Sequence, residues 1–184
     1  LVSKCEDFID ENTEFITAHS ILKDDLIGNY REIYERYIKI LEANGISDAR
    51  DNLEDMLLLD YLIMNVDRHL NNFGIIRDVN TLKWISVAPI FDSGEAMNLE
   101  MLDDDTMVIN DNGRLFNEVV YFDKFLELIR KTRKYDLEKL DSVVDECESI
   151  LKKYQDVSKM SDKDIYNLCY LLNLRIKKIK TNFR

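Results

Sequence analysis

Several residue types that would mark other classes of protein are scarce in this chain of 184 residues. Its three cysteines, Cys5, Cys147 and Cys169, are too few and too scattered for a disulfide framework or a zinc-binding pattern. The five glycines stand alone at positions 28, 45, 74, 94 and 113, so the sequence holds no glycine-rich phosphate-binding loop. No apolar run approaches the roughly 18 residues of a membrane span. We therefore expect a cytoplasmic protein that does not act at a membrane.

Positive charge is also in short supply. The formal net charge is −11 and the sequence pI is about 4.7, which disfavours long-range attraction to nucleic acid or to an anionic membrane. The densest basic run, residues 130–134 (Arg-Lys-Thr-Arg-Lys), is expected to cap the negative end of a helix rather than to bind a polyanion. We expect no direct contact between this chain and nucleic acid.

The sequence does contain a largely helical pattern. Asn29 with Glu32, and Ser161 with Asp164, predict capped helix starts, and Gly45 is expected to end the first of these helices. The spacing of apolar residues predicts further helical segments at 53–64, 121–131, 137–154 and 162–180. Short β-rich runs joined by a turn predict a hairpin, with strands at 73–77 and 83–88. The expected fold class is mainly α with a small β component (α+β).

Three polar residues between positions 67 and 92 have the spacing of a phosphotransfer site. Asp67 is followed five positions later by Asn72, the interval of a kinase catalytic loop, in which the aspartate receives the hydroxyl proton and the asparagine holds a metal ion. Asp92, with Gly94 two positions on, supplies a second carboxylate. The hairpin between Asn72 and Asp92 would bring all three side chains into one cleft. Oxygen ligands of this kind suit Mg²⁺.

The same segments resemble a known family. Residues 67–74 (Asp-Arg-His-Leu-Asn-Asn-Phe-Gly) and 88–94 (Ala-Pro-Ile-Phe-Asp-Ser-Gly) are similar, in motif and in order, to the C-terminal lobe of HipA-like serine/threonine kinases. The resemblance implies a protein-kinase-like C-lobe with a short β-hairpin at the active site. It also implies ATP as a cofactor with Mg²⁺, a protein substrate and scope for an antitoxin-like partner.

The resemblance also assigns roles to individual residues. The aspartate that matches Asp67 is the catalytic base of that family, and the residues that match Asn72 and Asp92 bind Mg²⁺. His69 matches a motif histidine with a supporting role, and we expect it to be a buried hydrogen-bonding strut. Arg68 is expected either to steady the loop through a carboxylate or to contact phosphate.

Two nearby features complete this expected site. Asp60 lies on the mostly apolar helix that precedes the motif, where a buried carboxylate must have a partner, and Arg68 is the candidate. The acidic residues 100–113 follow Asp92, at the place where protein kinases have their activation segment. We expect residues 100–113 to form a solvated loop or a short hairpin.

Other parts of an ATP kinase are missing from the sequence. A kinase needs a glycine-rich loop over the phosphates and a strand lysine, and neither is found here. Residues 5–9 and 14–18 look like the last strands of an N-terminal lobe, and residues 20–23 like the hinge that meets adenine. We expect residues 1–22 to be a remnant of that lobe and hinge, and residues 23–184 to be a helical C-lobe. The chain would then be a fragment that is itself inactive.

Three other functions stay open at this point. The pattern Asp-Arg-His-x-x-Asn also occurs in phosphoinositide-type lipid kinases, so the first motif alone does not define the substrate. The pattern Asp-x-His opens one family of metallophosphoesterases, but such sites draw on several histidines and this chain has only His19 and His69. A catalytically silent, kinase-like interaction module is the third alternative, and the intact set of Asp67, Asn72 and Asp92 argues against it.

Overall fold

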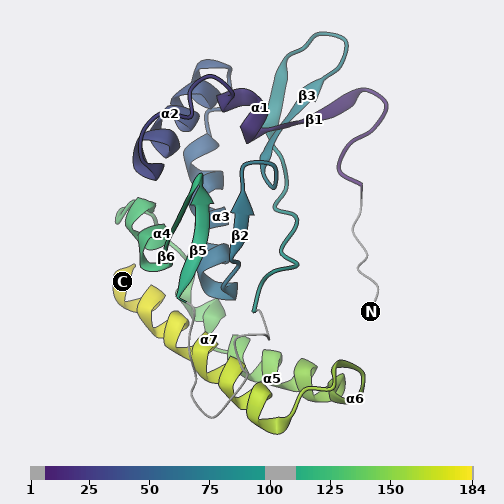
Figure 1. Ribbon diagram of the computed structural model, residues 1–184, viewed down its shortest axis with the longest axis vertical. Helices are drawn as coiled ribbons and strands as arrows, with labels where there is room; N and C mark the ends of the chain where they lie inside the picture. The colour runs from purple at the N-terminus through teal and green to yellow at the C-terminus, as the bar shows by residue number, and fades with distance from the viewer. Residues whose placement is uncertain (1–6, 98–110, 184) are drawn as a thin grey trace.

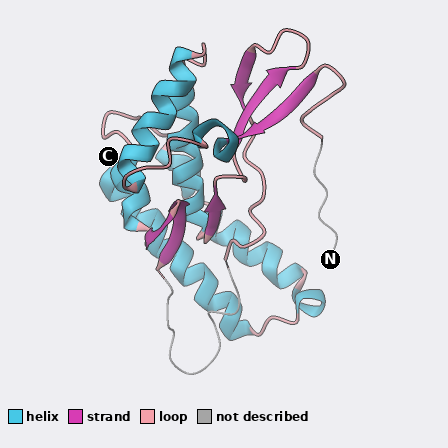
Figure 2. Cartoon of the chain, turned by 45° about the horizontal axis from the view of Figure 1, so that its top comes forward, coloured by secondary structure: helices cyan, strands magenta, loops and turns pink. Residues whose placement is uncertain are grey.

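The structure is a computed structural model that describes residues 7–97 and 111–183, and it combines helices with two small sheets (Figures 1 and 2). The antiparallel first sheet, at the upper right of Figure 1, has the order β1-β3-β4, with β1 at Thr13–Thr17, β3 at Gly74–Asp78 and β4 at Trp84–Val87. The second sheet has the order β2-β5-β6, with β2 at Asp67–His69, β5 at Asn112–Phe116 and β6 at Glu118–Tyr121. β2 runs parallel to β5, and β5 runs antiparallel to β6. The mixed α and β class agrees with the expectation from sequence.

The helices occupy most of the remaining described chain. They are α1 (Ala18–Leu22), α2 (Tyr30–Ala43), α3 (Ala49–Ile63), α4 (Asp123–Leu128), a 3-10 helix (Leu137–Leu140), α5 (Val143–Lys153), α6 (Gln155–Ser158) and α7 (Asp162–Asn182). Both predicted capping boxes are confirmed, at the starts of α2 and α7. None of the described helices is both long enough and apolar enough to cross a lipid bilayer.

The core joins α2 and α3 to the segment that carries the Asp67 motif. One apolar face of α2 is buried, with no exposed surface at Ile33, Tyr34, Tyr37, Ile38 and Leu41. Phe73 stands between Tyr37 and Phe116, and its ring makes an edge contact with each at a centroid distance of 5.6 Å. Such aromatic pairs stabilise by about 0.5–1.5 kcal/mol each beyond their burial. Phe73 therefore anchors the chain immediately after Asn72 in the core.

The predicted hairpin is confirmed, and it explains one glycine of the motif. β1 pairs with β3 along five residues, and Gly74 lies opposite Thr17 in this register. A Cβ atom at Gly74 would lie 2.0 Å from the carbonyl oxygen of Ile16, closer than any real contact. Gly74 is therefore required by the close approach of two strands, because any side chain there would push β1 away.

Several predicted boundaries were wrong. Residues 7–10 have no regular structure, so the part of the predicted strand 5–9 that is described is not a strand; residues 5 and 6 lie outside the described residues. The predicted hinge 20–23 is occupied by α1, because the Thr17 hydroxyl accepts a hydrogen bond from the Ser20 N–H and caps a short helix. The predicted helix 121–131 is shorter, since Tyr121 belongs to β6.

One further predicted helix is divided, and the predicted acidic segment lies partly outside the described residues. The predicted helix 137–154 is divided, with a 3-10 turn that ends at Leu140 and α5 beginning at Val143. Of the acidic segment 100–113, residues 100–110 lie outside the described residues, and Asn112 and Gly113 begin β5. The division of the chain at residue 22 stays a prediction, although β1 shares a sheet with the hairpin of the expected C-lobe.

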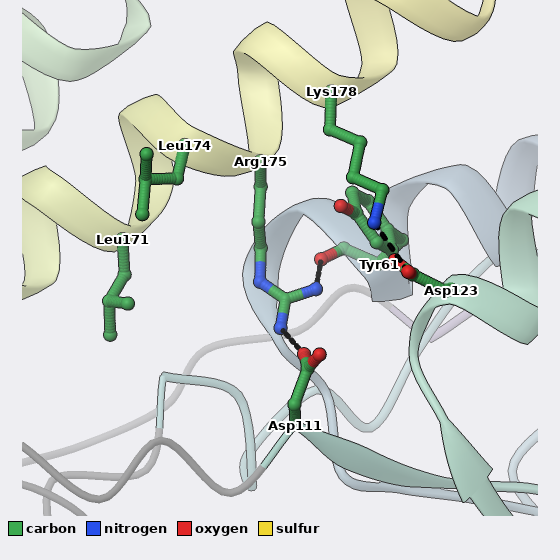
Figure 3. A pocket seen from close by; sticks show the side chains of 7 residues that line it. All are labelled: Tyr61, Asp111, Asp123, Leu171, Leu174, Arg175 and Lys178. Carbon is green, nitrogen blue, oxygen red and sulfur yellow. Dashed lines mark hydrogen bonds and ion pairs between the residues drawn. The ribbon is translucent and has the colours of Figure 1, made fainter.

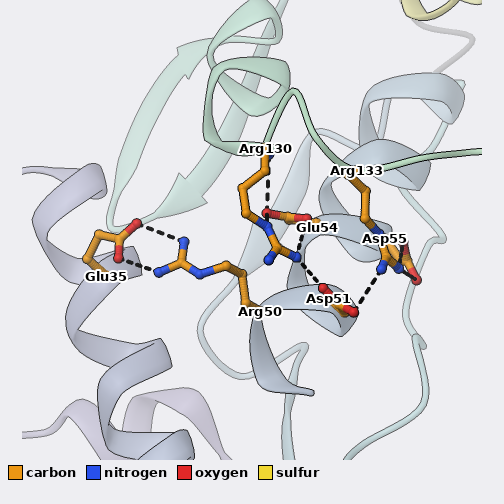
Figure 4. A network of polar contacts seen from close by, with 7 residues as sticks. All are labelled: Glu35, Arg50, Asp51, Glu54, Asp55, Arg130 and Arg133. Carbon is orange, nitrogen blue, oxygen red and sulfur yellow. Dashed lines mark hydrogen bonds and ion pairs between the residues drawn. The ribbon is translucent and has the colours of Figure 1, made fainter. Parts of the chain in front are cut away.

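The basic run at 130–134 binds carboxylates of α3 rather than capping a helix (Figure 4). Arg130 donates from Nε to Oε1 of Glu54 at 2.7 Å and also pairs with Asp51. Arg133 pairs with Asp51 at 2.8 Å and with Asp55 at 3.0 Å. Glu54 is fully buried and needs a charged partner, which Arg130 supplies. For these two arginines the prediction of helix capping was wrong, because acidic side chains on α3 pair with them.

Candidate active site

The end of α3 delivers Asp67 to the second sheet. Met64 closes the helix in the left-handed conformation with φ +54°, and Asn65 donates from its backbone N–H to the Asp60 carbonyl at 3.0 Å. The Val66 carbonyl then accepts a hydrogen bond from the Arg114 N–H at 2.8 Å, which starts the β2–β5 pairing. Asp67 consequently begins a strand and not a free loop, and its side chain is 40% exposed.

Arg68 is buried and ties three segments together. Its Nε and Nη2 atoms each donate to a carboxylate oxygen of Asp60 at 2.8 Å, which is a two-point ion pair. Its Nη1 atom donates to the carbonyls of Asn72 at 2.9 Å and of Phe91 at 2.6 Å. With a side chain only 1% exposed, Arg68 steadies the loop through a carboxylate and cannot reach a phosphate in solvent. The predicted pairing of Asp60 with Arg68 is confirmed.

Asn72 lies at the end of the turn that follows β2. Its side-chain Nδ2 donates to the Asp67 carbonyl at 3.1 Å, and its backbone N–H donates to the His69 carbonyl at 2.9 Å. A planar amide that donates through its nitrogen keeps its oxygen, Oδ1, as an acceptor for another group. Asn72 is 6% exposed, so this oxygen has a fixed position beside the backbone of Asp67.

His69 supports the same turn from a half-exposed position. Its Nδ1 atom accepts a hydrogen bond from the Asn71 N–H at 3.2 Å, and its Nε2 atom lies 3.8 Å from Oδ2 of Asp67. The expected supporting contact is present, but the expected burial is wrong because the side chain is 31% exposed. Alternation along β2 explains this, since Asp67 and His69 share the solvent face while Arg68 faces the core.

Asp92 lies on the segment that returns from the hairpin. The bond from Arg68 to the Phe91 carbonyl holds this segment beside β2, and in both ribbon views β2 lies between β5 and residues 88–97 (Figures 1 and 2). Asp92 is exposed and has φ +53°, in a stretch that is neither a helix end nor a hairpin turn. A non-glycine residue in this conformation costs on the order of 1 kcal/mol, so the surrounding structure must hold Asp92 in place.

The donor set suits a hard divalent cation. Within residues 7–97 and 111–183, no three or more His, Cys, Asp and Glu side chains cluster in a way that could hold a metal ion. Mg²⁺ does not require such a cluster, because it is usually bound by one or two carboxylates together with phosphates and water. The exposed carboxylate of Asp92 and the amide oxygen of Asn72 fit this mode of binding.

One cavity is lined by charged side chains that are already paired with one another. It has a volume of about 280 Å³ and is lined by residues of α3, α4 and α7 together with Asp111, none of which belongs to the Asp67 motif (Figure 3). Arg175 is stacked between the rings of Tyr61 and Phe122, at 4.7 and 4.5 Å, and pairs with Asp111 at 2.7 Å. Lys178 is likewise paired with an aspartate of the same cavity. These cations join helices and are not free to bind a ligand.

One residue of the site was missed by sequence reasoning. Arg114 on β5 places its Nη1 atom 3.5 Å from Oδ1 of Asp67. The two residues are direct neighbours in the β2–β5 register. They are far apart in the sequence, and no local pattern indicates that their strands pair.

In this fold a buried helix leads to Asp67 on a short strand, and the chain returns from the hairpin to Asp92 through a segment that Arg68 holds at the Phe91 carbonyl. The chain superposes on the Helicobacter pylori proinflammatory kinase CtkA with a TM-score of 0.61 and 19% identity, over 97% of this chain and 73% of that one. No protein family model matches the sequence, and no curated protein matches it. The likeness at this identity establishes the fold.

Proposed function

We propose that this chain is the C-terminal lobe of a HipA-like serine/threonine kinase, which transfers a phosphoryl group from ATP to a hydroxyl of a cytoplasmic protein. The observation that carries the proposal is the Arg68 clamp. One buried guanidinium binds the carbonyl of Asn72 and the carbonyl that precedes Asp92, so the two motifs are held together as one unit. The kinase fold of the neighbour supports the same reaction class.

Each polar residue then has a distinct task. Asp67, half-exposed on β2, accepts the proton of the incoming hydroxyl, the role of a general base within hydrogen-bond reach of its substrate. Asn72 and Asp92 would hold Mg²⁺, which neutralises phosphate charge when bound. This neutralisation matters in a chain of net charge −11, because the protein field itself repels ATP.

We further propose that the parts absent from this sequence complete the catalyst. A glycine-rich loop and a strand lysine align the phosphates in kinases, and their loss removes both orientation and charge stabilisation. Residues 1–184 alone should bind Mg²⁺-ATP weakly and transfer phosphate negligibly. Efficient protein phosphorylation by these residues alone would contradict the proposed lobe boundary.

Two isosteric variants of the protein expressed from its complete reading frame separate base from metal ligand. Asp67→Asn should keep Mg²⁺-ATP affinity but lower phosphoryl transfer by about a hundred- to ten-thousand-fold, because the lost carboxylate acts on the hydroxyl and not on the phosphates. Asp92→Asn should weaken both binding and transfer, because the lost charge would hold the ion.

The measurements are calorimetric titration of Mg²⁺-ATP and transfer of radiolabelled phosphate to protein. His69→Ala serves as a third variant, which should lower stability more than it changes the pH profile of transfer. If Asp67→Asn abolished nucleotide binding while Asp92→Asn spared it, the two assignments would be reversed.

A further inference from the structure

The second sheet presents a row of unlike side chains on its solvent face. In the registers of the sheet, Asp67 on β2 lies opposite Arg114 on β5, and Arg114 lies opposite Val119 on β6. Side chains at paired positions of neighbouring strands point to the same face. Asp67, Arg114 and Val119 therefore form a row that places a carboxylate, a cation and an apolar group in that order.

The opposite face of this sheet is packed, so the row is a true surface. Arg68 and Leu115, the next pair in the register, are each only 1% exposed. On β6, by contrast, Val119 is 70% exposed and Tyr121, two positions on, is 64% exposed. Two large apolar side chains thus extend the row toward the outer strand of the sheet, as far as the described residues define it.

Asp67 is the end of this row that lies nearest to the segment carrying Asp92, where Mg²⁺-ATP is expected. Residues 88–97, which include Asp92, lie along the other flank of β2 in both ribbon views (Figures 1 and 2). Asp67 consequently separates a metal-binding flank from the flank that carries Arg114 and Val119. Since a general base must touch the acceptor, the second flank is the place where an acceptor would continue.

Arg114 is available to an incoming anion. Its contact with Asp67, at 3.5 Å, is an ion pair between side chains that are 47% and 40% exposed, and within the described chain its guanidinium makes no hydrogen bond. Exposed pairs of this kind contribute little and exchange readily. An arginine that offers five N–H donors matches a carboxylate well.

We propose that this face is the acceptor-docking surface, and that it selects a peptide in which the hydroxyl residue is followed on one side by an acidic residue and then by an apolar residue. This inference rests on the proposed kinase function, which it deepens by naming a substrate class. The acidic residue pairs with Arg114 and frees the Asp67 carboxylate, and the apolar residue packs on Val119 and Tyr121.

Strand geometry sets the spacing of that peptide. Neighbouring strands lie about 4.8 Å apart, so Arg114 and Val119 are about 5 and 10 Å from Asp67 across the sheet. An extended peptide advances about 3.3 Å per residue. Because alternate side chains of an extended peptide share a face, the acidic residue is expected two positions from the hydroxyl residue and the apolar residue four positions from it, where Val119 and Tyr121 are both in reach.

Fluorescein-labelled peptides test the surface without nucleotide. Each peptide carries serine, then glutamate two positions away and leucine four positions away, in either chain direction, and a matched set replaces glutamate by lysine. Binding by fluorescence anisotropy to the protein from the complete reading frame should favour glutamate by about fivefold, the size of one exposed ion pair. Arg114→Glu should reverse this preference, and Arg114→Gln should remove it.

A charge-matched control separates the surface from the overall charge. Lys39→Glu changes the same sign of charge on an exposed position of α2 and should keep the preference for glutamate. Val119→Ser should weaken both peptide sets, because it removes the apolar contact without adding a charge. If neither set bound, or if Arg114→Glu kept the wild-type preference, the inference would be overturned.

A separate measurement tests the proposed kinase function. Titration of Mg²⁺-ATP into wild type and Asp92→Asn reports on the metal flank, where neither Arg114 nor Val119 lies. Intact nucleotide binding without peptide preference would refute the docking surface alone. If the wild-type protein did not bind Mg²⁺-ATP, the proposed function would be refuted instead.

Discussion

Replacing Asp60 by asparagine tests whether a buried ion pair holds the site together. The Asp60 carboxylate has no exposed surface and accepts two hydrogen bonds from Arg68 at 2.8 Å and one from Asn65 at 2.9 Å. Asparagine keeps the shape of the side chain but removes its charge. Its amide nitrogen would also replace a carboxylate oxygen and place an N–H donor against the N–H donors of Arg68 or Asn65. Because the Arg68 charge would stay buried and unpaired, we expect a loss of about 3–5 kcal/mol.

The assay is urea unfolding, followed by far-ultraviolet circular dichroism and by the fluorescence of Trp84, the single tryptophan. A loss of this size is a large part of the roughly 5–15 kcal/mol that stabilises a typical domain. Asp55→Asn is the matched control, because Asp55 lies on the same helix but is 47% exposed in its pair with Arg133. The control should cost no more than about 1 kcal/mol.

A second substitution separates the ion pair from the clamp. In the double variant Asp60→Leu, Arg68→Met both charges are replaced by apolar side chains. Such an apolar pair of similar volume often restores the stability that a single substitution loses. Recovery should be incomplete here, since the carbonyls of Asn72 and Phe91 lose the donor that Arg68 supplies. The reasoning fails if Asp60→Asn destabilises no more than the Asp55→Asn control.

Three further predictions concern packing, thiol reactivity and pH. Gly74→Ala should cost roughly 3 kcal/mol in the same urea assay, because its Cβ would meet the Ile16 carbonyl at 2.0 Å, and a loss below about 0.5 kcal/mol would contradict the strand approach. Burial raises the pKa of the Cys169 thiol to about 11, so Ellman's reagent at pH 8 should react with it slowly until urea unfolds the chain; rapid reaction in the native state would contradict this. Hydrogen bonds from the side chain and the backbone of Ser161 lower the pKa of the Asp164 carboxyl. The ionised Asp164 carboxylate therefore stabilises the folded chain above its ordinary pKa of 3.8, and this stabilisation is lost as pH falls through the lower pKa of the folded state. In acid unfolding, the destabilisation caused by Asp164→Asn should become smaller below pH 3.8; a larger effect there would contradict the assignment.

The elements that the sequence predicted well depend on neighbours within a few residues. The α2 capping box needs only Asn29 and Glu32, and each makes its cap bond in the structure. The hairpin turn likewise depends on Asp78, whose Oδ1 atom accepts bonds from the backbone N–H groups of Asn80 and Thr81. Hydrogen bonds this local are encoded where they form, so a single sequence is sufficient to place them.

Boundaries that failed involve competition between local and distant partners. The segment 20–23 has the character of a connector, yet it belongs largely to α1, which the Thr17 cap starts. The distant carbonyls of Phe73 and Leu70 hold this helix in place by accepting hydrogen bonds from the Ala18 and His19 N–H groups. The arginines of the run 130–134 were expected to bind a helix end, and carboxylates on α3 bind them instead. Composition shows how much charge a segment carries but not which partner reaches it.

The residues of the candidate site also differ in whether local sequence or tertiary structure reveals them. The sequence by itself was enough to predict Asp67, Asn72 and Asp92 as the candidate site, because kinase catalytic loops carry those groups at those spacings. Only the tertiary structure decided that Arg68 is a buried clamp, since its role depends on the burial of Asp60 and on two carbonyls that fold back to it. It alone also set Arg114 beside Asp67, because the pairing of β2 with β5 joins residues far apart in the chain, and such contacts form through the packing of the whole core.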